Sequence, residues 1–362
     1  MNKADLIVDI ANSRLSSQQI TTTKFTSPKE IVSWMGVIQS QDYAMSKWAI
    51  GCRLPNSTEQ IISKAIDKGE IIRTHILRPT WHLVAAEDIY WLLELTAPQI
   101  KSILKSSHKQ LEITPAILTK TNKLITAALA NNNHLTREEL ISVLEKRNIA
   151  TDGNRASHII LYAELEGLIC SGSSKEDKQT YALLSDRVLK PPPITREAAL
   201  EKLANKYFTS HGPATLQDFI NWSGLSITDA RKSIEMIQST FVSEKIGQEI
   251  YWIPTYFSPP KKDKVVYLLP AFDEYIIGYK NRSGMLSSAN YKKVISNNGL
   301  FYPTIVINGQ VTGSWKRVIK KDTVLIATSL FQPHTNSQKK TIEEEANKFG
   351  QFLDKKVIIK HA

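Results

Sequence analysis

The stretch of sequence that best indicates the fold is TREELISVLEKRNIATDGNRASHIILYAELEGLICSGSSKEDKQTYAL, residues 136–183. Its first four residues form a capping-box pattern, which is typical of the start of a helix. The Asp-Gly-Asn at 152–154 predicts a turn, and the apolar residues after it recur at helical spacing. Two short apolar runs, 168–170 and 180–183, then predict a hairpin. Helices that end in a hairpin are typical of a winged helix, whose wing here would be residues 172–178.

The same order of helices and a hairpin occurs on both sides of this stretch. Before it, strands are predicted over 71–77 and 80–84. After it, 241–243 and 249–253 can pair across a glycine turn. Three consecutive prolines at 191–193 predict a stiff, extended linker. We therefore expect three tandem winged-helix units, which occupy residues 1–110, 111–190 and 191–258.

The C-terminal part of the chain has a different pattern. It is rich in apparent strands, and Asn308-Gly309 is a strong signal for a two-residue hairpin turn. A capping-box pattern at Thr341 predicts a closing helix. The expected fold class is α+β, with three tandem winged-helix units followed by a small β-barrel-like domain and its closing helix. That domain is placed at residues 259–362, with strands over 264–269, 302–307, 310–319 and 323–330.

Two glutamines, in Gln39-Ser40-Gln41, lie where an apolar segment meets a helix. A helix is predicted over 27–36, residues 37–41 are predicted to be extended, and Asp42 can cap the next helix. Side chains two residues apart on an extended backbone point to the same side. Both amides could therefore hold one small object, such as a water molecule. Alternatively, they satisfy backbone groups at the entrance of a helix.

Charge and composition narrow the class of partner. The formal net charge is +11, which favours a polyanion, although charge alone does not separate DNA from RNA or an acidic membrane surface. Two cysteines are too few for a disulfide framework. The sequence has neither a signal-peptide core nor an apolar run of membrane-spanning length, so we expect a cytoplasmic protein. Repeated winged helices favour nucleic acid over the other interpretation, a platform for protein partners.

Familiar signatures of metal or cofactor chemistry are missing from the sequence. It has no Walker loop, no G-x-G-x-x-G after a strand and no H-E-x-x-H. His75 and His82 flank the first predicted hairpin without a cysteine or an acidic residue at ligand spacing. We expect no metal and no cofactor. Asp273-Glu274 could be an acid/base pair, or it could be a capped turn that enters a helix.

Several motifs, taken in order, resemble those of the winged-helix DNA glycosylases of the AlkZ/YcaQ type, which remove bulky N-alkylated bases and unhook interstrand crosslinks. The resemblance covers nearly the whole chain. Its motifs are Gln39-Ser40-Gln41, Arg78-Pro79-Thr80-Trp81-His82, Gly212-Pro213-Ala214-Thr215 with Asp218 and Trp222-Ser223-Gly224, Leu268-Leu269-Pro270-Ala271-Phe272-Asp273-Glu274-Tyr275, Tyr279-Lys280-Asn281-Arg282, and Asn308-Gly309 with Gly313-Ser314-Trp315-Lys316-Arg317.

The resemblance implies a concave, basic DNA cradle and a catalytic motif of glutamine, an aliphatic residue, and glutamine or aspartate. Gln39 and Gln41 take the catalytic places, whereas Ser40 replaces the aliphatic residue. The implied enzyme is a monofunctional DNA glycosylase that hydrolyses the N-glycosidic bond of cationic N-alkylated purines and binds damaged double-stranded DNA as a monomer. The alternatives are a non-catalytic winged-helix DNA-binding protein or regulator, and a protein scaffold.

Nine further residues are candidates for contact with DNA. Arg73 and Arg78 would reach phosphates beside the motif, and His82 would line the pocket; alternatively, Arg78 is a turn residue and His82 a partly buried donor. Arg155 begins a predicted recognition helix and could read a base or a phosphate. The Asn308 hairpin could probe a minor groove or be only a turn between strands. The remaining candidates, for flanking phosphates, are Lys280, Arg282, Lys316 and Arg317.

Overall fold

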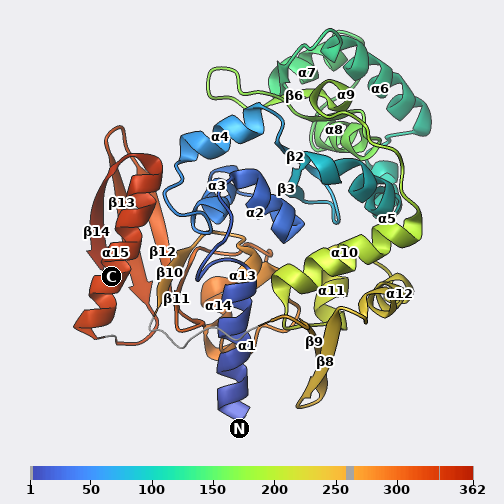
Figure 1. The fold of residues 1–362 in the computed structure, drawn as a ribbon. Coiled ribbons are helices and arrows are strands. Elements are labelled where there is room, and N and C mark those ends of the chain that lie inside the picture. The colour runs from blue at the N-terminus through green and yellow to red at the C-terminus, as the bar shows by residue number, and fades with distance from the viewer. Residues whose placement is uncertain (1–2, 258–264, 334, 362) are drawn as a thin grey trace.

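Helices and short hairpins alternate through the first two thirds of the chain (Figure 1). The structure is a computed structural model that describes residues 3–257, 265–333 and 335–361. Ser27 caps the second helix in a complete capping box with Glu30, and Pro28 is its first residue, as predicted. Asp42 caps the next helix by accepting a hydrogen bond from the backbone of Met45. The elements up to residue 110 are α1 (Lys3–Ser17), α2 (Pro28–Met35), β1 (Val37–Gln39), α3 (Tyr43–Gly51), α4 (Glu59–Asp67), β2 (Ile71–His75), β3 (Trp81–Ala85), η1 (Ala86–Asp88) and α5 (Ile89–Gln110).

The middle of the chain follows the predicted order of elements closely. Thr136 and Glu139 form the expected capping box, and the second helix begins at Arg155 directly after the turn at 152–154. The elements are α6 (Pro115–Leu129), β4 (Leu135–Thr136), α7 (Arg137–Glu145), α8 (Arg155–Leu165), β5 (Ile169–Ser171), β6 (Thr180–Leu183) and α9 (Leu184–Arg187).

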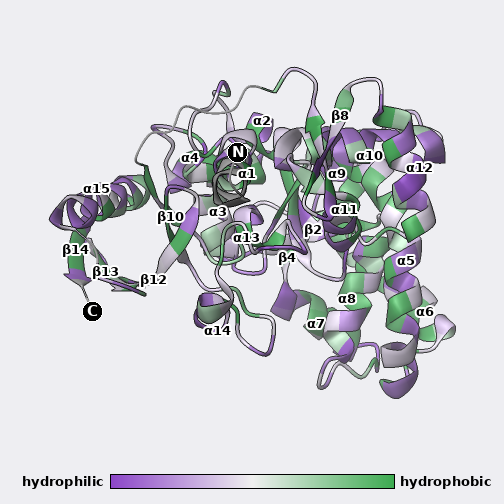
Figure 2. Cartoon of the chain, turned by 90° about the horizontal axis from the view of Figure 1, so that it is seen from below, coloured by the Kyte–Doolittle hydropathy of each residue, from purple (hydrophilic) through white to green (hydrophobic). Residues whose placement is uncertain are grey.

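The third group of elements repeats this order. Thr215 caps a helix in a capping box with Asp218, and Gly224 ends that helix in the left-handed conformation that glycine adopts without strain. The elements are α10 (Arg196–His211), β7 (Ala214–Thr215), α11 (Leu216–Ser223), α12 (Ile227–Ile237), β8 (Phe241–Ile246) and β9 (Glu249–Pro254). Hydrophilic residues cover the outer side of α12 in Figure 2.

Each group contains a three-stranded antiparallel sheet, in which a short strand joins the hairpin that follows it. The strand orders are β1-β3-β2, β4-β6-β5 and β7-β9-β8. The interpretation of these groups as three winged-helix domains with the expected boundaries stays a prediction, and the boundary at 258/259 lies outside the described residues.

The C-terminal part is a curled half-barrel sheet of five strands, ordered β10-β11-β12-β13-β14. It does not close, because β10 and β14 are its two edges. A long helix, α15, lies between the last two strands in sequence and packs against the sheet (Figure 1). The elements are β10 (Val266–Leu269), α13 (Glu274–Ile277), η2 (Ser288–Asn290), α14 (Tyr291–Val294), β11 (Thr304–Ile307), β12 (Gln310–Ile319), β13 (Thr323–Leu330), α15 (Asn336–Leu353) and β14 (Lys356–His361).

Two expectations for this part were wrong. The closing helix is capped by Thr335 in a capping box with Gln338, so it begins before the predicted start at Thr341. The chain does not end in that helix, because β14 follows it and pairs in parallel with β13. The expected start of the first strand, Lys264, lies outside the described residues.

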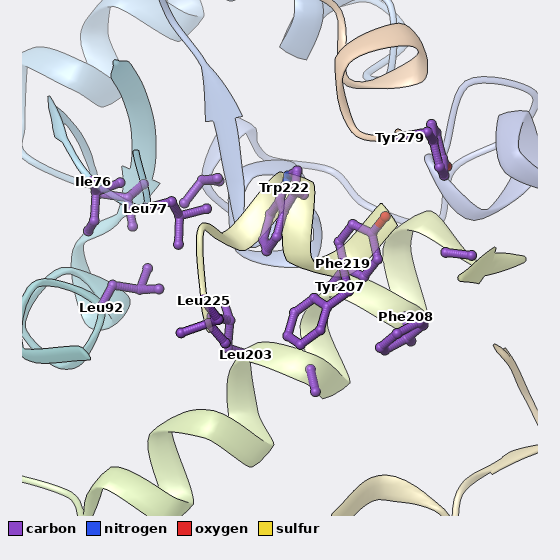
Figure 3. Close-up of a cluster of buried hydrophobic side chains, with 14 of the residues drawn as sticks. Ile76, Leu77, Leu92, Leu203, Tyr207, Phe208, Phe219, Trp222, Leu225 and Tyr279 are labelled. Atoms are coloured by element: carbon purple, nitrogen blue, oxygen red, sulfur yellow. The ribbon is translucent and has the colours of Figure 1, made fainter. Parts of the chain in front are cut away.

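The hydrophobic cores cross the expected boundaries. One core joins α1, the first hairpin, the helices α10 to α12 and part of the C-terminal sheet. Figure 3 shows its centre, where Trp222 and Tyr207 lie between the hairpin residues Ile76 and Leu77 and the distant Tyr279. A second core joins α2 to α4 with the C-terminal sheet and α15, whereas most of the middle group has a core of its own. The described helices include none that is long and apolar enough to cross a membrane.

Two buried ion pairs connect the first part of the chain to later parts of it. Arg53 donates two hydrogen bonds of 2.8 Å to the carboxylate of Asp273, and it also bonds the side chain and backbone of Gln18. Arg14 contacts Asp218 at 3.3 Å. All of these charged side chains are almost completely buried, so each depends on its partner.

We predict that Asp273→Ala lowers the free energy of unfolding by about 3–5 kcal/mol, because it leaves the Arg53 guanidinium buried without its partner. The control is Glu197→Ala, which breaks an exposed pair with Lys232 and is expected to cost less than about 1 kcal/mol. Urea unfolding of both variants measures the difference. Equal losses in the two variants would contradict the role given to Asp273.

Candidate functional site

Gln39 is held in place through its backbone. It is the last residue of β1 and lies opposite His82 in the sheet. Its N–H donates a 2.8 Å hydrogen bond to Oε1 of Glu274, a residue of the C-terminal part. The Gln39 side chain is only 9% exposed, and its Oε1 accepts a longer hydrogen bond, 3.4 Å, from Nη2 of Arg78. The first glutamine is thus fixed on both its backbone and its side chain.

Gln41 differs from Gln39 in being exposed at the surface. Within the described ranges, no residue forms a hydrogen bond with its side chain. The strand ends at Gln39, and a bend at Gln41 and Asp42 leads into α3, so the predicted extended segment stops two residues early. The pair therefore consists of one anchored amide and one amide that is free to meet solvent or a ligand.

Ser40, between the two glutamines, is completely buried. Its N–H donates to the carbonyl of Trp81 at 2.7 Å, and its Oγ lies 2.8 Å from Oγ of Ser46. Arg73 donates two further hydrogen bonds, from Nε to Ser40 Oγ at 3.1 Å and from Nη2 to the Ser40 carbonyl at 2.9 Å. The serine is therefore accommodated by a polar network that an aliphatic side chain could not join.

Glu274 connects the motif to two other parts of the chain. Its Oε2 accepts a 3.1 Å hydrogen bond from Nε1 of Trp222 and lies 3.5 Å from Nε2 of His211. The preceding residue, Asp273, caps α13 by accepting from the backbone of Tyr275. The interpretation of Asp273-Glu274 as a capped turn is confirmed. The sequence contains no local signal for the contact between Glu274 and Gln39, because the two residues are far apart in the chain.

The side chain of Arg78 contacts other protein residues beside the motif. Nη1 donates to the carbonyl of Asn221 and Nη2 to Gln39, each at 3.4 Å. Burial lowers the pKa of the Arg78 guanidinium, and the nearby Glu274 opposes that shift. These contacts direct the guanidinium toward Gln39, whereas the sequence predicted a contact with phosphate.

His82 is fully buried beneath the motif. Its Nδ1 lies 2.9 Å from the carbonyl of Thr80, whereas its Nε2 has no hydrogen-bond partner in the described part of the chain. Burial holds the pKa of His82 well below its usual range, so the ring is neutral near pH 7. His82 lies opposite Gln39 in the sheet, and the expected role in a pocket wall stays a prediction. His75 has an acidic partner that the sequence did not reveal, since its Nδ1 lies 2.6 Å from Oε2 of Glu164.

The structure brings only one of the more distant basic candidates next to the motif. Nη2 of Arg317 lies 3.5 Å from the carboxylate of Asp42, directly after Gln41. Lys316 is exposed and precedes Arg317 in the strand, so its side chain points to the opposite face of the sheet. Lys280 is also exposed. Arg282 donates to the carbonyl of Ile276 at 2.7 Å and stacks on Phe301.

Two candidates have protein partners in place of the predicted role. Arg155 donates to the carbonyls of Ala150 and Leu111, so its guanidinium is used within the fold. Asn308 is in the predicted turn, but that turn packs against α1. A Cβ added at Gly309 would lie 2.9 Å from Cβ of Ala11, and the Gly309 carbonyl accepts a 2.7 Å hydrogen bond from the Tyr275 hydroxyl. The expectation of a projecting probe is corrected: this tip is covered.

A pocket of about 890 Å³ opens beside the motif, between the first hairpin and the middle group of elements. It is lined by Arg73, Trp81, Arg137, Lys178, Gln179 and Tyr181, among others. No group of three histidine, cysteine, aspartate or glutamate residues in the described ranges is arranged to hold a metal ion.

Comparisons with known proteins agree with one another. A family model described as DNA glycosylase AlkZ-like matches residues 32–352, a range that includes both glutamines. The solved structure of Streptomyces sahachiroi DNA glycosylase AlkZ is similar to this chain with a TM-score of 0.79 and 18% sequence identity. The alignment covers 98% of this chain and 99% of that chain. No curated protein matches this chain.

The buried, neutral His82 predicts a pH dependence of stability. Its pKa is lower in the folded protein than in the unfolded chain, so the unfolded state binds the extra proton and stability falls as pH drops below about 6.5. We predict that His82→Asn, which keeps a donor near the Thr80 carbonyl, removes about 1.4 kcal/mol of the loss between pH 7.5 and 5.5.

Urea unfolding of the wild type and of His82→Asn at both pH values measures this effect. The other histidines are present in both proteins, so their contributions cancel in the comparison. The same loss of stability in the two proteins would mean that His82 is not the group that titrates.

Proposed function

The chain belongs to the AlkZ-like DNA glycosylase family, and on that basis we propose that it hydrolyses the N-glycosidic bond of cationic N-alkylated purines with a water held by Gln39 and Gln41. As a member of this family it is a DNA-repair glycosylase that binds DNA. We propose further that the reaction is monofunctional.

The main support for the proposal is that the two glutamines differ in their contacts with the rest of the protein. Gln39 is anchored by Glu274 and Arg78, whereas Gln41 is exposed and its side chain has no partner in the described residues. A fixed amide next to a free one suits a site that orients a small molecule at the surface of the protein. If the pair served only to satisfy backbone groups at the helix entrance, Gln41 would be engaged with that backbone.

The chemistry of the substrate explains why such a site would be sufficient. A glutamine amide does not titrate near neutral pH, so neither residue can act as a general base. A purine alkylated at N7 or N3 already carries a positive charge. When its bond to C1′ breaks, the electron pair passes to the base, which leaves as a neutral molecule and needs no general acid.

Water supplies the other half of the reaction. Its oxygen forms the new bond to C1′ of the deoxyribose, its extra proton passes to solvent, and the product is an abasic site. The amide carbonyls would orient this water and stabilise the positive charge that develops on the sugar. Dipoles fixed in advance contribute about 2.7–4 kcal/mol each when they are well placed. A neutral site of this kind would act weakly on uncharged bases, which gives selectivity for damage.

We propose that exposed basic residues hold the DNA backbone around this site, with the protein acting as a monomer on damaged double-stranded DNA. Lys280 is exposed and follows closely after α13, the helix that begins with Glu274. Arg317 lies beside Gln41 through its contact with Asp42. Phosphate contacts of this type make affinity fall with salt concentration.

We predict that Gln39→Ala and Gln41→Ala each lower the single-turnover rate of N7-methylguanine excision by about 10²–10³-fold, because each removes one of the two amide dipoles that would act on the water and the sugar. DNA affinity and thermal stability should change little in the Gln41 variant, since that side chain is exposed. The measurement is alkaline cleavage at abasic sites in an oligonucleotide with one N7-methylguanine. Gln60→Ala, which replaces an exposed glutamine of α4, is the control and should keep the full rate.

Full excision by the double variant Gln39→Ala/Gln41→Ala would exclude the catalytic role of the pair. Loss of folding in either single variant would instead favour the structural interpretation of the two amides.

Arg78 generates a separate prediction, because its guanidinium faces Gln39 and Asn221. Arg78→Met should leave the slope of log affinity against log salt unchanged, whereas Lys280→Ala should lower its magnitude by about one. Titrations of undamaged duplex at several salt concentrations measure both slopes. A change of about one for Arg78→Met would show that this arginine reaches a phosphate in the complex.

A further inference from the structure

Arg73 forms two hydrogen bonds with the glutamine motif. It lies on β2, and two of its nitrogens donate to the hydroxyl and the carbonyl of Ser40 at 3.1 and 2.9 Å. The carbonyl of Ser40 belongs to the peptide bond that leads directly to Gln41. A side chain that fixes this carbonyl restricts the rotation of the peptide, and hence the direction in which Gln41 leaves the backbone.

The guanidinium of Arg73 is itself held between aromatic rings. Its central carbon lies 4.0 Å from the centre of the Trp81 ring and 5.2 Å from that of Tyr43. The His75 ring packs against Trp81 with the ring centres 3.9 Å apart and the planes tilted by 43°, which supports the ring that Arg73 contacts. Burial lowers the pKa of Arg73. The planar group is therefore oriented before any ligand arrives, as a positioning group must be.

Two residues of the middle group of elements also form hydrogen bonds with Arg73. Nη1 of Arg73 donates a 2.7 Å hydrogen bond to Oε1 of Gln179, just before β6, and the backbone N–H of Arg73 donates to Oγ of Ser171 in β5 at 2.9 Å. Both partners belong to the hairpin of the middle group. Arg73 thus links that hairpin to the segment that carries Gln41.

We propose that Arg73 is a positioning residue that aims Gln41 by clamping the carbonyl and hydroxyl of Ser40, and that the hairpin of the middle group holds it through Gln179 and Ser171. The functional part of this inference rests on the proposed glycosylase reaction. It replaces the expectation that Arg73 contacts phosphate, because at least three of its five N–H donors are directed at protein acceptors.

The central variants are Arg73→Met, which keeps the length of the side chain and removes its donors, and Arg73→Lys, which keeps one charged donor. Single-turnover excision of N7-methylguanine at saturating enzyme separates the rate from DNA affinity. We expect Arg73→Met to lower this rate at least about tenfold with an unchanged salt slope, and Arg73→Lys to recover part of the loss. A salt slope reduced by about one with an unchanged rate would overturn the proposal in favour of a phosphate contact.

Ser40→Val provides a second test through coupling. In the wild type it removes the acceptor of Arg73 Nε, and in Arg73→Met that acceptor is no longer used. The fold-loss of rate in the double variant Arg73→Met/Ser40→Val should therefore be smaller than the product of the fold-losses in the two single variants. We expect the difference to be about three- to a hundredfold. Losses that multiply would mean that the two residues act independently and would contradict the clamp.

Hydrogen exchange tests the positioning claim without any activity measurement. Exchange of the segment 37–43 should become faster in Arg73→Met, because the Ser40 segment loses its clamp. Lys178→Ala, which removes an exposed basic side chain from the same pocket, should leave this exchange unchanged. Unchanged exchange in Arg73→Met would overturn the clamp. If the wild type does not excise the base, the glycosylase proposal fails, and the exchange result still decides the role of Arg73.

Discussion

The candidate site depends on the contacts that the Glu274 carboxylate forms with other parts of the chain. This carboxylate joins β1, where Gln39 lies, to Trp222 in α11 and to the start of α13. The residues on either side strengthen this junction, since Asp273 binds Arg53 and Tyr275 binds the backbone of Gly309 and Ala11. Three consecutive residues therefore connect the first, third and C-terminal parts of the chain. Because buried charged and polar groups need their partners, these parts are fixed relative to one another around Gln39.

That constraint explains how amides alone can form a useful site. Gln39 is held from behind by Glu274 and Arg78, Ser40 is held by Arg73 and Ser46, and Gln41 is left exposed at the end of this supported segment. A weak dipole contributes to catalysis only when its direction is set before the reaction. Contacts from every part of the chain hold Gln39, Ser40 and Arg73, including those from the hairpin of the middle group. Position 40 has a serine where the sequence resemblance implies an aliphatic residue, and Arg73 donates hydrogen bonds to the hydroxyl and the carbonyl of this serine.

Local signals in the sequence predicted most helices and strands. The contacts that hold the site, by contrast, join residues that are far apart in the chain. The capping box at Thr136 was predicted correctly because it uses residues within one turn of a helix. The start of α15 was predicted at Thr341, whereas the capping box that begins this helix is formed by Thr335 and Gln338. The sequence indicated the two glutamines as candidates, but it did not indicate the residues that contact them. No periodicity in the sequence indicates that Glu274 meets Gln39, that Arg73 meets Gln179, or that α1 covers the turn at Asn308.

We propose that an uncharged amide pair can cleave only a glycosidic bond whose base already carries a positive charge. This proposal is tested by comparing single-turnover release of N7-methylguanine and of uracil, a neutral base, from otherwise identical duplexes at saturating wild-type protein. We expect release of N7-methylguanine and no detectable release of uracil. Similar rates for both bases would contradict it, and so would tight binding of the damaged duplex without release of either base.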